Sequence, residues 1–193
     1  MRSWEPRLDE RVVLVATALS AAKIPFAFGG ALALAYHGVP RVTVDIDLNV
    51  FVPRRNAERV LRVLKPLGIQ AGRSATATLN TDGQCRLRWE PYTLDIFLSV
   101  NEFHDSCAER VRSVPFLDET IPILSAEDLV TFKALYDRPK DWLDIEQLLF
   151  AQAGTFDVGY VEEWLDRLVG SGDERVAKFA SSIARVSGES DAT

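Results

Sequence analysis

The stretch "FGGALALAYHGVPRVTVDIDLNVF" (residues 28–51) places a glycine pair upstream of two aspartates that are one residue apart. Residues 41–52 alternate between polar and apolar types, which is the rhythm of a strand with one buried face. On such a strand Asp45 and Asp47 share a face with Thr43, while aliphatic side chains occupy the opposite face. Two carboxylates this close repel each other unless a cation lies between them. The stretch therefore predicts a half-buried strand whose charged face binds a cation.

A second strand-like segment (residues 92–100) supplies another carboxylate in the same kind of setting. Asp95 alternates there with Leu94 and Ile96, so it lies on the polar face of its strand. Placed beside the first strand, it would complete a cluster of three carboxylates. Mg²⁺ prefers oxygen ligands and is usually held by carboxylates together with substrate phosphates. Three carboxylates on adjacent strands can hold two such ions and stabilise an in-line phosphoryl displacement.

The glycine pair Gly29-Gly30 lies between two predicted elements, an apolar strand at residues 24–28 and a helix at residues 31–37. A glycine turn lets the backbone approach a phosphate closely, and the free N–H groups at the start of a helix point toward it. We therefore expect this turn to bind phosphate groups of a substrate.

Composition limits the class of protein. The chain has 193 residues, the size of one domain with a helical extension, and a net charge of -6, which argues against a generally basic nucleic-acid coat protein. Cys85 and Cys107 form neither a metal-binding spacing nor a disulfide framework, and we expect the isolated His37 and His104 to be structural. The apolar run at residues 12–22 follows two acidic residues and is short for a membrane span. We expect a soluble cytoplasmic protein without a membrane partner.

The remaining pattern predicts an α/β N-terminal part and a helical C-terminal part. Residues 1–122 form the first, residues 123–187 the second, and residues 188–193 a disordered tail. Ser125 and Asp128 stand in capping-box spacing at the start of a helix. The predicted helices cover residues 12–23, 31–37, 54–68, 125–137, 139–154, 160–169 and 173–186, and the predicted strands cover residues 24–28, 41–52, 85–89 (an edge strand) and 92–100.

The glycine pair, "RVTVDIDL" and the later "LDIFL" together resemble the nucleotidyltransferase superfamily related to DNA polymerase beta. The downstream "ILSAEDLVTFKALYDRPKDWLDIEQLL" (residues 123–149) is similar to its AbiEii/MenT-like branch, which includes bacterial toxins of toxin–antitoxin and phage-defence systems. The resemblance covers about residues 25–149. It implies a nucleotidyltransferase palm of the α/β (α+β) class, with a mixed β-sheet flanked by helices and a C-terminal helical region packed on it.

The resemblance also implies roles for particular residues. Gly30 stands where many members carry serine, so a hydroxyl contact to phosphate is missing from this chain. For Asp144, as for Asp141, a capping or ion-pair role is at least as well supported as a catalytic one. The implied catalytic residues are Asp45, Asp47, Asp95 and Lys133, the metal ligands Asp45, Asp47 and Asp95, and the nucleotide-binding residues Gly29, Gly30, Thr43, Lys133 and Asp144, with Asp95 also activating the acceptor hydroxyl.

Some of these residues have a second interpretation. Lys133 falls on the apolar stripe of its helix, so it either reaches into a cleft or extends its amine outward to water. Thr43 suits a strand as a β-branched residue, and it is also a candidate phosphorylation site because some toxins of the branch are regulated beside the Asp-x-Asp motif. Arg55, Arg59 and Arg62 share one face of a helix, which is either a solvated face or a patch that contacts the phosphates of an RNA.

The function that follows is Mg²⁺-dependent transfer of a nucleoside monophosphate from an NTP to an acceptor, with release of pyrophosphate and two metal ions in the site. By branch resemblance the favoured acceptor is the 3′ end of tRNA, and the chain is a toxin held by a cognate antitoxin. One alternative is another acceptor, such as an aminoglycoside or a protein hydroxyl. The other is a nucleotide-binding module without turnover, although the presence of all three carboxylates argues against it.

Overall fold

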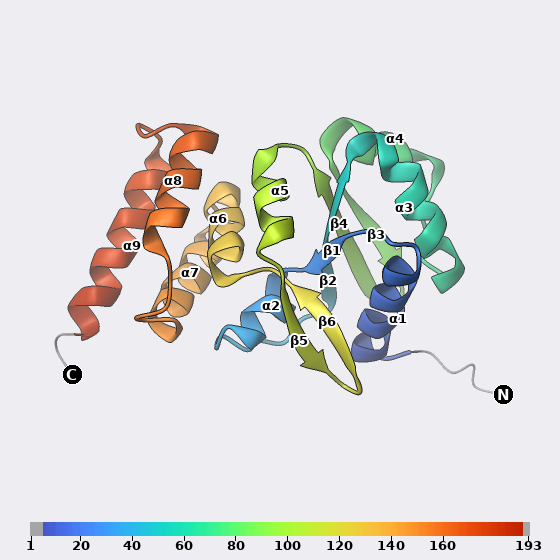
Figure 1. Cartoon of the computed structure of the whole chain (residues 1–193), viewed down its shortest axis with the longest axis horizontal. Helices are drawn as coiled ribbons and strands as arrows, with labels where there is room; N and C mark the ends of the chain where they lie inside the picture. Colours follow the sequence, from blue (N-terminus) through green and yellow to red (C-terminus); the bar gives the residue numbers. More distant parts are fainter. Residues whose placement is uncertain (1–5, 191–193) are drawn as a thin grey trace. The chain divides into compact units, whose positions relative to one another are not determined.

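The computed structural model describes residues 6–190 and divides into two compact units (Figure 1). The first, which we call the sheet unit, takes residues 1–32 and 42–124, and the second, the helical unit, takes residues 33–41 and 125–193. The sheet unit thus ends at Leu124, and the segment from 33 to 41 belongs to the helical unit although it precedes most of the sheet in the chain.

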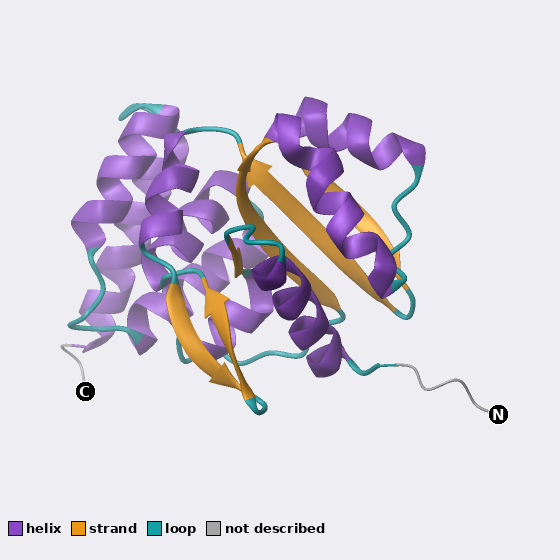
Figure 2. Ribbon diagram, turned by 45° about the vertical axis from the view of Figure 1, so that its right-hand side comes forward, coloured by secondary structure: helices purple, strands orange, loops and turns teal. Residues whose placement is uncertain are grey.

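The sheet unit is built on one mixed sheet, which within the described residues has six strands (Figure 2). These are β1 (Phe26–Phe28), β2 (Asp45–Pro53), β3 (Gln84–Trp89), β4 (Tyr92–Ser99), β5 (Arg112–Phe116) and β6 (Glu119–Ile123). Their order is β3-β4-β2-β1-β6-β5. β2 runs parallel to β4 and antiparallel to β1, and β1 runs parallel to β6. The mixed sheet expected from the resemblance is thus present, with β3 at one edge.

The two faces of the central strands differ as the alternation predicts. Ile46, Leu48 and Ile96 are at most 3% exposed, whereas the aspartates between them are partly exposed. Burial of the aliphatic side chains stabilises the sheet and orients the strands. The carboxylates are consequently held on the opposite face without being buried in the core.

Helices supply the rest of the core of the sheet unit. They are α1 (Leu8–Ala21), α3 (Ala57–Leu64), α4 (Arg73–Asp82) and α5 (Glu102–Glu109), with short 3-10 turns η1 (Arg54–Asn56) and η2 (Lys65–Leu67). α3 is amphipathic: Val60, Leu61 and Leu64 are buried, and its arginines face solvent. α3 packs against α1 and α4. A further helix, α2 (Gly30–Tyr36), begins in the sheet unit and ends in the helical unit.

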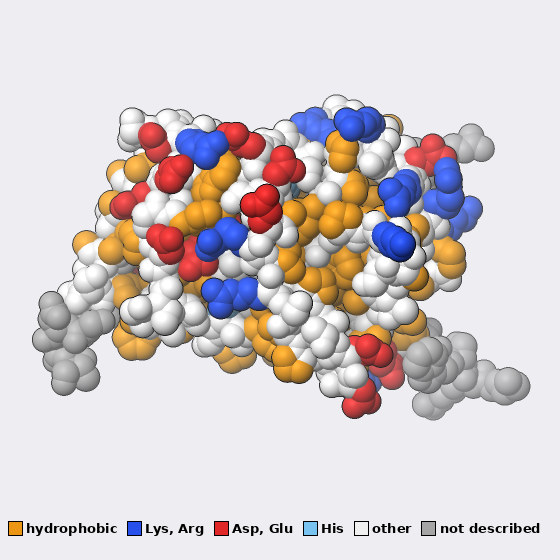
Figure 3. All heavy atoms as spheres, viewed as in Figure 1, with side chains coloured by type: hydrophobic (Ala, Val, Ile, Leu, Met, Phe, Trp, Pro, Cys, Tyr) orange, Lys and Arg blue, Asp and Glu red, His pale blue; other side chains and the backbone are white. Residues whose placement is uncertain are grey.

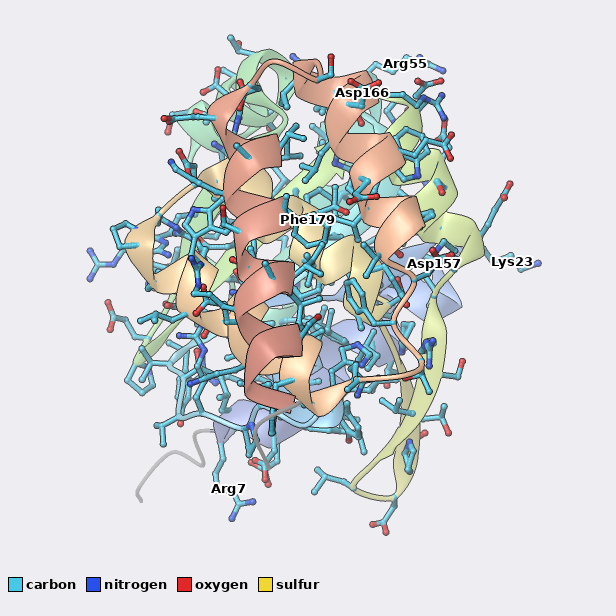
Figure 4. The ribbon with its side chains drawn as sticks, turned by 90° about the vertical axis from the view of Figure 1, so that its left-hand side faces the viewer. Arg7, Lys23, Arg55, Asp157, Asp166 and Phe179 are labelled. Carbon is cyan, nitrogen blue, oxygen red and sulfur yellow. The ribbon has the colours of Figure 1, made fainter. Side chains whose placement is uncertain are left out.

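The helical unit contains the helices α6 (Ala126–Tyr136), α7 (Pro139–Ala151), α8 (Val158–Val169) and α9 (Glu174–Ser190). The predicted cap is present, because the Ser125 side chain accepts a hydrogen bond of 3.1 Å from the backbone amide of Asp128. Asp157 caps α8 in the same way. Figure 4 shows Phe179 pointing from α9 toward the neighbouring helices, and its side chain is only 1% exposed.

Several elements depart from the sequence predictions. α4 lies in a segment for which no helix was expected, because its Ser, Thr and Asn residues have weak helix propensity; burial of Ala75 and Leu79 against neighbouring helices outweighs it. α5 and the β5–β6 hairpin were not predicted at all. The strand expected from residue 41 begins only at Asp45, and Val42 before it is 98% exposed.

The C-terminal boundary also differs. α9 continues to Ser190, so residues 188–190 of the expected disordered tail are helical, and residues 191–193 lie outside the described residues. Over the described part of the chain, no helix combines the length and apolar composition needed to cross a membrane.

Candidate active site

The register of the two central strands brings the three predicted aspartates together. In the parallel pairing of β2 with β4, Asp47 lies opposite Asp95 and Asp45 lies opposite Thr93. Since alternate residues share a face, Asp45, Asp47 and Asp95 project from the same side of the sheet. Two strands that are far apart in sequence thereby present one acidic cluster.

Asp45 is held by two threonines. The hydroxyl of Thr93 donates a hydrogen bond of 2.5 Å to Oδ1 of Asp45. The hydroxyl of Thr43 accepts a hydrogen bond of 3.0 Å from the backbone amide of Asp45 and lies 3.1 Å from its carbonyl oxygen. Thr43 therefore orders the backbone at the start of β2, which supports its structural interpretation, while its phosphorylation and its contact with the nucleotide stay predictions.

Asp95 is bound by an arginine that the sequence reasoning did not single out. Arg86 lies opposite Asp95 in the antiparallel β3–β4 pair, and its Nε and Nη2 donate hydrogen bonds of 2.7 and 2.6 Å to the two carboxylate oxygens. The Asp95 carboxylate, and to a lesser extent those of Asp45 and Asp47, raise the pKa of Arg86 above its ordinary value. A signal was available, because "CRLRW" places two arginines on one face of the predicted edge strand.

The glycine pair is tied to the same cluster. The amide of Gly29 donates a hydrogen bond of 2.9 Å to the carbonyl oxygen of Asp47. Gly30 has a positive φ of 51°, and a β-carbon built on it would lie 1.8 Å from Oδ2 of Asp47. Only glycine fits that position. The turn thus has a packing reason to be glycine in addition to the expected approach of a phosphate.

The residues of this cluster have the chemistry of a Mg²⁺ site. They offer carboxylate oxygens from adjacent strands, the donor type that this ion prefers. Within the part of the chain that the structure describes, no group of three or more acidic, histidine or cysteine side chains is arranged to hold a metal ion as it stands. Both oxygens of Asp95 are directed at Arg86 instead. The donor set fits the ion, and the Arg86 contact accounts for the present orientation of Asp95.

Lys133 belongs to the helical unit and lies in a buried ion-pair network. Its Nζ donates a hydrogen bond of 2.5 Å to Asp144 and lies 3.4 Å from Asp141, and its side chain is 6% exposed. Arg138 also pairs with Asp141, at 2.5 Å, and Arg41 lies 3.6 Å from Asp144. The Lys133 amine does not extend outward to water, and Asp141 and Asp144 have the ion-pair role that the sequence left open.

Of the arginines proposed to contact RNA, Arg59 and Arg62 lie on α3, and Arg55 lies on η1 immediately before it. Arg59 donates a hydrogen bond of 3.0 Å to the carbonyl of Ala22 after α1, and Arg62 pairs with Glu58 on its own helix. Arg55 extends outward from the ribbon (Figure 4). Figure 3 shows Lys and Arg side chains on the side of the sheet unit that carries α3 and α4. The predicted face is therefore exposed and basic, and its role toward RNA stays a prediction.

Comparison with known proteins gives one family and several similar folds. A family model described as "Nucleotidyl transferase AbiEii toxin, Type IV TA system" matches residues 12–157. Comparison with curated protein sequences gives no significant match. The chain is similar to the solution structure of the antibiotic-resistance factor ANT(2'')-Ia (TM-score 0.54, 16% identity, covering 95% of this chain and 98% of that one). It is also similar to the crystal structure of ANT(2'')-Ia with adenylyl-2''-tobramycin (TM-score 0.56, 17% identity, covering 89% and 97%).

Proposed function

The chain belongs to the AbiEii nucleotidyltransferase toxin family, and from this premise we propose that it transfers a nucleoside monophosphate from an NTP to an acceptor hydroxyl and releases pyrophosphate. The observation that carries the proposal is the register that sets Asp47 opposite Asp95, next to the Gly29-Gly30 turn. Metal-binding carboxylates and a backbone turn for phosphate are the parts that such a transfer needs.

Each residue of the cluster has a distinct task in the proposed reaction. Asp45, Asp47 and Asp95 would hold Mg²⁺, which when bound neutralises the triphosphate and lowers the pKa of the acceptor hydroxyl. Thr93 fixes the orientation of Asp45 through its hydrogen bond. Asp95 receives the proton of the attacking hydroxyl. Gly29 and Gly30 have no side chains of their own, so their backbone leaves the phosphates access to the carboxylates.

Two further assignments rest on the family resemblance. Lys133 is proposed to contact the nucleotide, and Asp144 to assist it; the ion pair between them holds the amine in one place and is compatible with that role. Thr43 is proposed as a nucleotide contact and a regulatory phosphorylation site. A phosphate on Thr43 would remove the hydroxyl that now binds the backbone of Asp45 and would add negative charge beside the carboxylates.

For the acceptor we propose RNA, in particular the 3′ end of tRNA. The branch resemblance favours it, and the exposed basic face formed by η1 and α3 (Arg55, Arg59 and Arg62) is compatible with phosphate contacts. ANT(2'')-Ia, which is in complex with adenylyl-2''-tobramycin in one structure, is similar to this chain in fold. A small-molecule acceptor is therefore the alternative to RNA that the experiment below must distinguish. As a member of a toxin family, the chain is proposed to be neutralised by a cognate antitoxin in the cytoplasm.

Two experiments test the proposal. Expression of the wild type should arrest growth, and Asp45→Ala should relieve the arrest, while Asp118→Ala in the exposed β5–β6 turn serves as a matched control that stays toxic. Incubation of the protein and Mg²⁺ with each of the four labelled NTPs, together with total tRNA, cell extract or aminoglycosides, shows where the label is transferred. Equal toxicity of wild type and Asp45→Ala would contradict the toxin assignment. Label on an aminoglycoside rather than on RNA would contradict the acceptor assignment.

A further inference from the structure

The ion pair between Arg86 and Asp95 plays no role in the reaction proposed above. Its two hydrogen bonds, at 2.7 and 2.6 Å, reach different oxygens of the carboxylate. A bidentate pair of this kind takes the lone pairs that lie in the carboxylate plane on the side of the guanidinium. While this ion pair is formed, the Asp95 side chain is turned toward β3, and both of its carboxylate oxygens bind Arg86.

The two partners differ in their freedom to move. The Asp95 side chain is 13% exposed and short, and its strand is paired on both sides, with β2 and with β3. The Arg86 side chain is 62% exposed, long, and located on the edge strand. Exposed arginines lose little by leaving a surface ion pair, because water solvates the guanidinium. Arg86 is therefore the partner that can move away, and Asp95 is the fixed one.

Arg86 and a divalent metal ion would compete for the carboxylate of Asp95. Arg86 binds Asp95, which shares one face of the sheet with Asp45 and Asp47, so one positive charge lies beside three carboxylates. A divalent ion bound by the same carboxylates carries twice that charge and repels a guanidinium at the shared oxygens. The Arg86 guanidinium and the divalent ion therefore cannot bind the carboxylate oxygens of Asp95 at the same time.

We propose that Arg86 is a positioning residue: it occupies Asp95 in the metal-free protein and leaves when the metal arrives, which frees Asp95 for the reaction. The proposal rests on the proposed function, since it requires a divalent ion at the aspartate cluster. It involves an exchange of ionic partners and no covalent step. Its direct consequence is that Arg86 weakens metal binding, because every metal ion that enters must displace it.

The test is a titration of the full chain with Mn²⁺ alone, in which the free ion is counted by electron paramagnetic resonance. Arg86→Gln is compared with Arg88→Gln, a control on the same strand and the same face, whose side chain is 73% exposed and pairs with Glu90. We expect Arg86→Gln to bind Mn²⁺ about fivefold more tightly than the wild type, as the loss of a competing surface ion pair predicts, and Arg88→Gln to bind it with unchanged affinity. Asp47→Asn should abolish binding, and melting curves in EDTA verify that each variant is folded.

The possible outcomes separate this proposal from the proposed function. Equal affinity of wild type and Arg86→Gln, with binding still lost in Asp47→Asn, would mean that Arg86 remains in place as a static pair; the proposal fails while the metal site stands. An equal gain in Arg88→Gln would attribute the effect to general charge and would also overturn it. Failure of the folded wild type to bind Mn²⁺ at all would overturn both the proposal and the metal site on which it rests.

Discussion

Gly30 lies so close to Asp47 that a β-carbon added to it would be 1.8 Å from Oδ2 and 2.4 Å from the carboxyl carbon. Gly30→Ala must therefore push the Asp47 carboxylate aside or shift the start of α2, and its positive φ adds strain. Since a misplacement of about 1 Å at a reacting centre can cost about 100-fold, we expect a loss of nucleotide transfer of at least that size. Steady-state transfer rates at saturating NTP measure it.

A matched glycine isolates the effect. Gly72, which precedes α4 in the same unit, has room for a methyl group, because the nearest atom to its β-carbon would be the Ser74 hydroxyl at 3.8 Å. Gly72→Ala should retain wild-type transfer. If Gly30→Ala were equally active, the close approach of Gly30 to Asp47 would have no bearing on catalysis.

Thr93 offers a finer test of the carboxylate cluster. Thr93→Val keeps the shape of the side chain and removes the hydroxyl that donates to Asp45 at 2.5 Å. A hydrogen bond to a charged group contributes about 1.5–3 kcal/mol, so we expect kcat to fall by about tenfold or more, with a higher Mg²⁺ concentration needed for half-maximal rate. The measurement is a Mg²⁺ titration of transfer activity.

Thr93→Ser keeps the hydroxyl and should recover most of the rate. Thr81→Val, which removes a hydroxyl that donates within α4, should leave the Mg²⁺ dependence unchanged. A serine variant as poor as the valine variant would assign the effect to packing of the methyl group rather than to the hydrogen bond.

His104 links stability to pH. Burial lowers the pKa of His104 to about 4, against the weaker opposing effect of the Asp105 charge, whereas the unfolded chain has a histidine pKa near 6.5. Between these values the unfolded state binds more protons, so the stabilisation is complete above about pH 6.5 and is lost as pH falls toward 4. We expect His104 to account for a loss of about 3 kcal/mol in unfolding free energy over that window.

Chemical denaturation at several pH values between 4 and 7 measures this contribution. In His104→Asn the amide nitrogen can take the place of Nδ1, which contacts the Asn101 side chain at 2.9 Å, but the side chain no longer titrates. The variant should show a smaller decrease in stability toward low pH. Parallel pH profiles of wild type and variant would contradict the assignment.

The basic face of η1 and α3 leads to a prediction about the acceptor. If Arg55, Arg59 and Arg62 contact RNA phosphates, changing all three to Gln should weaken RNA binding and reduce its salt dependence, since about one counterion is released per phosphate contacted. Binding of Mg²⁺–NTP should be unchanged. RNA affinity measured at several salt concentrations tests this, with changes at Arg167 and Arg185 of the helical unit as a control for the loss of positive charge elsewhere on the protein. An unchanged salt dependence would leave the face as a solvated helix surface.

What the sequence could predict depends on the range of the interactions involved. The alternation around Asp45 and Asp47 reports the two faces of β2 directly, because side chains on a strand have a period of two. The position of Asp95 beside them needed only the assumption that two strands are neighbours. The Arg86 contact depends on the register of β3 against β4, which the short turn between Trp89 and Tyr92 fixes; the arginines were visible in the sequence, but their partner across this hairpin was not assigned. α4 escaped prediction for a different reason, since packing decides its conformation.

Lys133 shows the same limit and gives the last prediction. Its place on an apolar helix stripe was visible, but its partners come from the next helix, where Asp144 and Asp141 accept its charge in a site that is almost completely buried. Removal of one member of a buried ion pair leaves an uncompensated charge and typically costs about 3–5 kcal/mol. We expect Lys133→Met to lower the unfolding free energy by about that amount, and denaturant titration measures it.

A double-mutant cycle separates stability from catalysis at this position. Asp144→Asn in the Lys133→Met background removes the stranded charge and should restore part of the lost stability, so that the two effects are less than additive. If Lys133 also contacts the nucleotide, the double variant should remain inactive despite its recovered stability. Recovery of both stability and transfer would show that Lys133 acts only by holding the helical unit together, whereas additive losses of stability would contradict the coupling between Lys133 and Asp144.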